Sequence, residues 1–89
     1  MNHLAVAGFA QAIRVTHGAR AMLLRRERVV ERFRGRTVWA GEVLVFALEG
    51  HATARRCYAW EVDGKVMAVL GVPPVDSAAA AVRASIVSS

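Results

Sequence analysis

Apolar side chains occupy almost every position from residue 38 to residue 48, where Glu42 is the only polar side chain. Read with the two-residue period of a strand, one face carries Trp39, Val43, Val45 and Ala47, and the other carries Val38, Ala40, Leu44, Phe46 and Leu48. A strand in a half-solvated antiparallel sheet would alternate apolar with polar side chains. We therefore expect residues 37–48 to form a strand that is covered on both faces, either by the chain's own helices or by a partner on one face.

One helix is predicted at each end of the chain. Residues 3–16 have a broad apolar face, and His17-Gly18 supplies a C-terminal stop. This face consists of Leu4, Val6, Phe9, Ala10, Ala12 and Ile13. The second helix begins after a cap at Asp76 or Ser77, whose side-chain oxygen can accept amide protons of the first turn, and continues to about Val87. Its apolar stripe is Ala79, Val82 and Ile86, with Arg83 directed elsewhere.

Residues 22–33 fit two templates imperfectly. As a helix, this segment places Arg26 within an apolar stripe, and as a strand both of its faces mix apolar with charged side chains. The adjacent Val29 and Val30 and the following turn at Arg34-Gly35-Arg36 favour a strand that leads into a hairpin. We expect a strand here, with a helix as the alternative.

Two further strands complete the predicted sheet. Residues 54–62 place Tyr58 and Trp60 on one face, and Asp63-Gly64 is a two-residue hairpin turn, because both of its central positions need positive φ. Residues 65–71 return as the fourth strand, while Gly41 marks a bulge or a close approach in the second. The predicted fold class is α+β: a four-stranded antiparallel meander sheet with an N-terminal and a C-terminal helix, α-β-β-β-β-α, in a single domain spanning residues 1–89.

The composition excludes several classes of protein. With 55% hydrophobic and 21% charged residues in 89 positions, the chain is neither disordered nor long enough for two cores. A single cysteine, Cys57, excludes an intramolecular disulfide and fits a reducing compartment. No apolar run approaches the ~18–20 residues of a membrane span, and residues 1–10 lack the basic start of a signal peptide. We expect a cytoplasmic protein.

The net charge of +5 is concentrated in the first part of the chain. Eight arginines and two glutamates lie between Arg14 and Arg36, a net charge of +6, and the rest carries −1. If residues 22–33 form a strand, four arginines project from one side as an anion-binding ridge: Arg26, Arg28, Arg32 and Arg34. Three interpretations stay open, namely an edge strand protected from aggregation, a surface for an acidic protein, and a surface for nucleic acid.

Residues suited to catalysis or metal binding do not form recognisable motifs. Cys57 and His51 lack an orienting third group, and the three histidines have no ligand spacing. Glu27 and Glu31 stand among arginines, which lower carboxyl pKa values rather than prepare a general acid. No glycine-rich phosphate loop is present. The sequence therefore predicts a protein that is not an enzyme, with no metal and no cofactor.

Residues 49–86 resemble double-stranded-RNA-binding domains in the order of their parts. Gly50-His51 precedes a strand, Asp63-Gly64-Lys65 forms a hairpin, and an Ala-rich helix follows Gly71. That family holds phosphates with lysines at the start of its last helix, where this chain has Asp76 and then Ser and Ala residues. The resemblance therefore implies a topology without the family's phosphate-binding residues.

A second resemblance covers the Trp39-Ala40-Gly41-Glu42-Val43 segment and Cys57-Tyr58-Ala59-Trp60. These residues are similar to those of small uncharacterised proteins from GC-rich bacteria and their mobile elements, which implies no particular activity.

The two-faced strand leads to a first hypothesis about function: a small non-enzymatic binding protein that forms a homodimer through its sheet. The interface residues expected for it are Trp39, Val43, Val45, Tyr58 and Trp60. The second hypothesis is nucleic-acid binding through the arginine ridge, where Arg56 with the aromatic Tyr58 and Trp60 is a further candidate group. The third is a mobile-element inhibitor that binds an acidic host protein through the same ridge.

Overall fold

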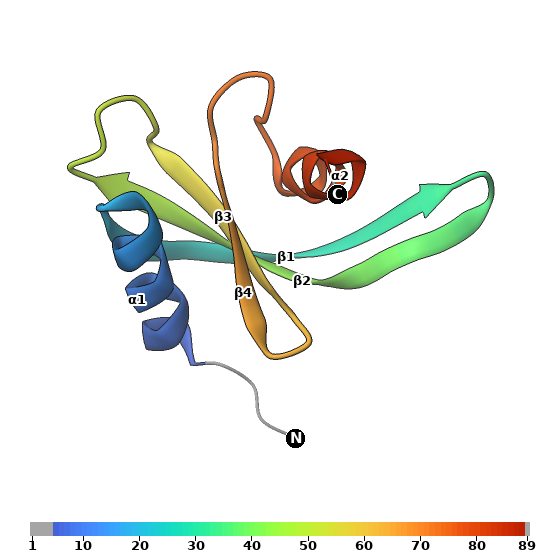
Figure 1. Cartoon of the computed structure of the whole chain (residues 1–89), viewed down its shortest axis with the longest axis horizontal. Helices are drawn as coiled ribbons and strands as arrows, with labels where there is room; N and C mark the ends of the chain where they lie inside the picture. The colour runs from blue at the N-terminus through green and yellow to red at the C-terminus, as the bar shows by residue number, and fades with distance from the viewer. Residues whose placement is uncertain (1–4, 89) are drawn as a thin grey trace.

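The computed structural model describes residues 5–88, and side chains as far as residue 87. Its elements follow the order α1 (Val6–His17), β1 (Arg20–Phe33), β2 (Arg36–Glu49), β3 (Arg56–Val62), β4 (Lys65–Leu70) and α2 (Ala78–Ser88). The four strands pair antiparallel in the order β1-β2-β3-β4, as Figure 1 shows. The predicted α+β class and the α-β-β-β-β-α order are confirmed, and residues 22–33 are strand rather than helix.

The hairpin turn at Asp63-Gly64 has the predicted positive φ at both central positions, and the predicted turn after β1 has the same geometry. Asp63 and Gly64 have φ values of 51° and 78°, and Arg34 and Gly35 have φ values of 53° and 76°. Positive φ at both central positions is the geometry of a type I′ turn, whose twist matches that of the flanking strands. Arg34 therefore lies in the turn and does not extend the row of side chains along β1, which corrects its predicted place in the ridge.

Side-chain and glycine caps define the helix ends. Gly18 takes the left-handed conformation, with φ 68°, and its N–H donates to the carbonyl oxygen of Arg14. At the other end of the chain, Ser77 Oγ accepts the N–H of Ala80 at 3.1 Å, so Ser77 rather than Asp76 caps α2. The predicted helix start at residue 3, and Leu4 on its apolar face, lie outside the described residues. Within the described residues, no helix has the length and apolar character needed to cross a membrane.

The two helices cover opposite faces of the sheet. One core cluster joins Ala78, Ala81 and Val82 of α2 to Val29, Val43, Val45, Tyr58 and Trp60 of the sheet. The other joins Phe9 and Ile13 of α1 to Leu44, Phe46, Cys57 and Ala59. The chain's own helices therefore cover both faces of β2 over the segment from Val43 to Phe46. In α2 the buried stripe includes Ala78 and Ala81, whereas the predicted Ile86 is exposed.

The strands β1 and β2 are much longer than the strands beside them. Each has 14 residues, whereas β3 has 7 and pairs only with residues 44–47 of β2. Residues 27–33 of β1 and 36–43 of β2 therefore continue as a two-stranded extension, which we call the distal ribbon. It projects past α2 at the right of Figure 1. Its seven residues of β1, at about 3.3 Å each, give a length of about 23 Å.

Gly41 is a point of close approach, one of the two roles predicted for it. A Cβ atom at residue 41 would lie 2.8 Å from Cζ2 of Trp39, because the indole ring lies over this glycine. The same ring meets Trp60 with centroids 6.0 Å apart and an interplanar angle of 59°. The register shifts in the β1–β2 pairing fall elsewhere, at Leu24 and Val38. Gly41 thus lets Trp39 fold back along the ribbon toward the core.

Candidate nucleic-acid interface

One face of the distal ribbon is held against α2. Val29 packs in the core cluster of α2, and the buried carboxylate of Glu31 accepts a hydrogen bond from Arg83 Nε at 2.7 Å. Glu31 is only 9% exposed, and the hydrogen bond between the two side chains raises the pKa of the Arg83 guanidinium above its ordinary value. Arg83 lies off the apolar stripe of α2, as predicted, and its guanidinium reaches the sheet at Glu31. Helix α2 contacts the ribbon at Val29 and Glu31. These contacts set the direction in which the ribbon projects from the rest of the domain, which we call the body.

The opposite face of the distal ribbon is uncovered, and we call it the open face. Its members are exposed side chains of the two strands, namely Arg28, Val30, Arg32, Ala40 and Glu42. Glu42 lies directly across from Arg28 in the register, yet its Oε1 accepts from Nη1 of Arg26, at 2.9 Å. Arg28 and Arg32 form no ion pair with any residue that the structure describes. The open face therefore offers two free guanidinium groups.

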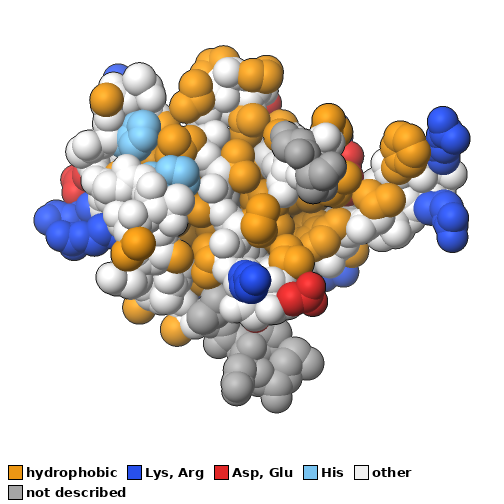
Figure 2. All heavy atoms as spheres, in the orientation of Figure 1, with side chains coloured by type: hydrophobic (Ala, Val, Ile, Leu, Met, Phe, Trp, Pro, Cys, Tyr) orange, Lys and Arg blue, Asp and Glu red, His pale blue; other side chains and the backbone are white. Residues whose placement is uncertain are grey.

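The tip of the ribbon combines basic side chains with an exposed aromatic ring. Phe33 is 63% exposed, and the guanidinium carbon of Arg34 lies 5.3 Å from its ring centroid. Arg36 faces Phe33 in the register and, among the described residues, has no carboxylate partner. From residue 32 to residue 41 the sequence holds three arginines and no acidic residue. Figure 2 shows hydrophobic and basic side chains together at the end of this projection.

The structure divides the predicted arginine ridge. Arg26, Arg28 and Arg32 lie on one face of β1, but Arg26 is ion-paired with Glu42 and Arg34 lies in the turn. Sequence reasoning missed Arg36 and Phe33 at the tip of the ribbon, where strand alternation places them on the face opposite Arg28 and Arg32. The available signal was the length of the predicted strands: two long strands beside two short ones must leave one hairpin end unpaired by the rest of the sheet.

The predicted homodimer interface lies inside the chain's own core. Val43, Val45, Tyr58 and Trp60 are between 0 and 4% exposed beneath α2, and Trp39 packs against the same cluster. The sequence showed that this sheet face needs a cover, but did not show that α2 provides it. Burial also removes Tyr58 and Trp60 as platforms for stacking bases beside Arg56.

The remaining candidate residues have structural roles. Cys57 is a buried free thiol, and its burial raises its pKa to about 12, which keeps it protonated and unreactive near neutral pH. His51 Nδ1 accepts the N–H groups of Thr53 and Ala54, at 3.2 and 2.9 Å, and so organises the loop before β3. Among residues 5–88 no three His, Cys, Asp or Glu side chains gather as a metal site.

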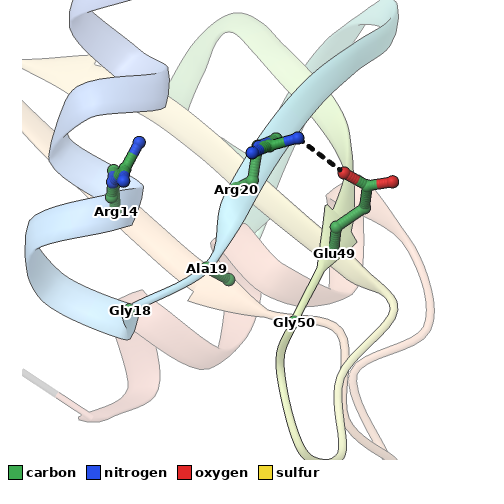
Figure 3. A pocket seen from close by; sticks show the side chains of 6 residues that line it. All are labelled: Arg14, Gly18, Ala19, Arg20, Glu49 and Gly50. Carbon is green, nitrogen blue, oxygen red and sulfur yellow. Dashed lines mark hydrogen bonds and ion pairs between the residues drawn. The ribbon is translucent and has the colours of Figure 1, made fainter.

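A shallow pocket lies far from the ribbon tip, where the end of α1 meets the start of β1 and the end of β2. Its volume is about 320 Å³, and Figure 3 shows its lining: Arg14, Gly18, Ala19, Arg20, Glu49 and Gly50. Arg20 Nη1 already approaches Glu49 Oε1 at 3.5 Å, and both side chains are largely exposed. Of these lining residues, Arg14 alone brings a guanidinium without a carboxylate partner in the described chain. The open depression therefore offers no enclosed site for a ligand.

The distal ribbon therefore combines arginines that have no carboxylate partner among the described residues with an exposed aromatic ring. Comparisons of the chain with models of protein families, with curated proteins and with solved structures found no match.

Proposed function

We propose that this protein is a non-enzymatic nucleic-acid-binding protein that uses the distal ribbon as its binding element. The observation that carries the proposal is the set of four guanidinium groups on the ribbon without a carboxylate partner among the described residues: Arg28, Arg32, Arg34 and Arg36. Arginine forms paired hydrogen bonds to phosphate oxygens, and neutralising phosphates releases condensed counterions. A projecting ribbon brings these groups to a ligand without obstruction from the body.

Protection of an edge strand explains only part of this charge. The strand β1 is at the edge of the sheet, and arginines along it do discourage pairing with a second chain. Arg36 lies on the part of β2 whose outer edge is also free, since β3 pairs only with residues 44–47, but Arg34 lies in the turn. Arg34 guards neither free edge of the ribbon, so edge protection does not account for its guanidinium group at the tip.

The dimensions of the ribbon suit a groove of duplex DNA. The major groove, about 12 Å wide, admits a two-stranded β-ribbon, and other proteins place their strands in the minor groove. Arg28 and Arg32 are four residues apart on one strand, which separates their Cα atoms by about 13 Å. The hydrogen bond between Glu31 and Arg83 holds the other face on α2, so little conformational entropy is lost when the open face binds.

The test is a binding titration with a fluorescently labelled 25-base-pair duplex at several salt concentrations. The triple substitution Arg28→Gln, Arg32→Gln and Arg36→Gln should reduce the salt slope by about 2.7, because each phosphate that is no longer neutralised lowers the slope by about 0.9. A matched control carries Arg14→Gln, Arg55→Gln and Arg56→Gln, which removes the same charge away from the ribbon. Equal reductions in the two triple variants, or no binding by the wild type at low salt, would contradict the proposal.

An acidic protein, including a host protein bound by a mobile-element inhibitor, would use the same arginines. The same titration separates this alternative, because polyglutamate should then compete with DNA at equal charge. The homodimer hypothesis was based on an uncovered apolar face of the sheet, and α2 covers that face. It remains a prediction, to be checked by light scattering. A nucleic-acid ligand and an unpaired Cys57 both support a cytoplasmic location.

A further inference from the structure

The strongest unexplained feature of the distal ribbon is the aromatic ring at its end. Phe33 is 63% exposed on the last residue of β1, at the far end of a ribbon about 23 Å long. It belongs to neither core cluster of the described residues. A phenylalanine left in water at this position forgoes the stabilisation that burial would give. Apart from the contact with Arg34, its placement is not explained by packing within the described residues.

Three guanidinium groups accompany this ring in the chain. Arg34 lies over the ring face at 5.3 Å, Arg36 stands across from Phe33 on β2, and Arg32 precedes it. Arg34 and Arg36 thus bring two cations beside the ring, and Arg32 adds a third on the opposite face of the ribbon, where each can meet a phosphate near the inserted ring. Arg34 and Gly35 form a tight two-residue turn, so the tip of the ribbon is narrow.

The geometry points to duplex DNA as the ligand class and to Phe33 as a wedge that opens one base step. This inference rests on the proposed nucleic-acid binding and adds a distortion of the duplex to it. Apolar side chains that enter a base step from the minor groove unstack it and bend the helix axis by about 20–90°. Arginines beside the wedge meet the negative potential of that groove and the adjacent phosphates.

In this arrangement the two parts of the tip do different work. The arginines supply affinity and its salt dependence, since each contact with a phosphate releases counterions. The ring supplies deformation, because its exposed surface is buried between bases as they separate. Removing the ring should therefore leave the salt slope unchanged but abolish the bend. The substitution is also mild for the fold, because the side chain is exposed.

The test uses the full chain at low salt and at saturating protein, with a 25-base-pair duplex that carries a donor and an acceptor dye at its ends. The wild type and Phe33→Leu, which keeps an apolar wedge, should shorten the distance between the dyes. Phe33→Ala should bind with the same salt slope and leave the distance as in free DNA. A 2-aminopurine reporter in the duplex should brighten with the wild type and not with Phe33→Ala.

Two outcomes with the duplex alone would overturn the wedge while sparing the proposed function. One is a wild type that binds the duplex with a steep salt slope but neither bends it nor raises the 2-aminopurine signal. The other is Phe33→Ala bending DNA as the wild type does. Tighter binding to a single strand of the same sequence, with no bending of the duplex, would also overturn it and assign the ring to base stacking. No binding to either DNA would overturn both proposals.

Discussion

Each end of the β1–β2 hairpin carries a phenylalanine, which is buried at one end and exposed at the other. Phe46 lies where β3 pairs with β2, is 0% exposed, and packs against α1. Phe33 lies at the other end of the hairpin and is 63% exposed. In the body, both faces of β2 are covered and both edges of the strand are paired; in the distal ribbon, only the face toward α2 is covered.

This difference separates the part of the hairpin that stabilises the fold from the part that is available for binding. Leu44, Val45 and Phe46 are each nearly inaccessible, so a change there alters packing on one face or the other. Side chains of the open face and the tip are largely solvated, so their composition is free to follow a ligand. The following predictions test that separation, in order of decreasing expected effect on stability.

The largest effect should come from truncating the two phenylalanines. Phe46→Ala should lower the free energy of unfolding by about 3–5 kcal/mol, because it removes a buried ring and leaves a cavity. Phe33→Ala should change it by less than about 0.5 kcal/mol, since the ring is already in water. Urea denaturation followed by circular dichroism measures both. If Phe46→Ala fails to fold, Phe46→Leu gives the same comparison; equal destabilisation at the two positions would break it.

A smaller effect is expected where the ribbon joins the body. In Gly41→Ala the new Cβ would meet the Trp39 ring at 2.8 Å, which displaces the ring from Trp60. We expect a net destabilisation of about 1 kcal/mol, because the reduced entropy of the unfolded chain offsets part of the steric cost. Tryptophan fluorescence should shift to longer wavelength. Trp39→Leu in the same chain should relieve the clash, and additive effects in the double variant would contradict this packing.

Burial in the body should protect the Cys57 thiol from reagents in solution, whereas the exposed side chains of the ribbon have no such protection. The raised pKa of about 12 predicts that Ellman's reagent at pH 8 reacts only after the chain is unfolded in urea. The folded state keeps its proton above the ordinary pKa of 9.0, where the unfolded thiol loses it. Stability should therefore be unaffected below pH 9 and fall as pH rises from 9 toward 12. Cys57→Ala should remove this part of the pH dependence, and rapid labelling of the native protein would refute the burial.

The smallest effect on stability should follow from neutralising the ribbon. The triple substitution at Arg28, Arg32 and Arg36 should leave the free energy of unfolding within about 0.5 kcal/mol, or raise it slightly, because like charges are removed. Thermal melting in low and high salt measures this. A large decrease in stability would show that these side chains support the fold, and the division between body and ribbon would then fail.

Much of the architecture follows from local patterns. Apolar side chains on both faces of residues 37–48 predict a strand that is covered on both sides. Asp63-Gly64 predicts a hairpin turn, because both of its central positions need positive φ. The strand preference of Val29 and Val30 correctly favours a strand over a helix for residues 22–33. These features depend on interactions between near neighbours, which the order of residues specifies directly.

The candidate site was only partly accessible to such reasoning. Alternation placed Arg26, Arg28 and Arg32 on one face, but it could not show that Glu42 would neutralise Arg26. That ion pair depends on the cross-strand register, which is set by the turn and by the irregularity at Val38 between the turn and this pair. The exposure of Phe33 likewise depends on how far α2 extends over the ribbon face that carries Val29 and Glu31.

The sequence by itself determined that residues 37–48 form a strand that needs a cover on both faces, and it determined where the chain turns. Only the tertiary structure decided that α2 is one of these covers, with Arg83 anchored on Glu31, and that the uncovered surface is the opposite side of the ribbon. The physical reason is that alternation is a property of one strand, whereas burial is a property of two surfaces in contact. Which surfaces meet depends on the lengths and directions of all the elements together.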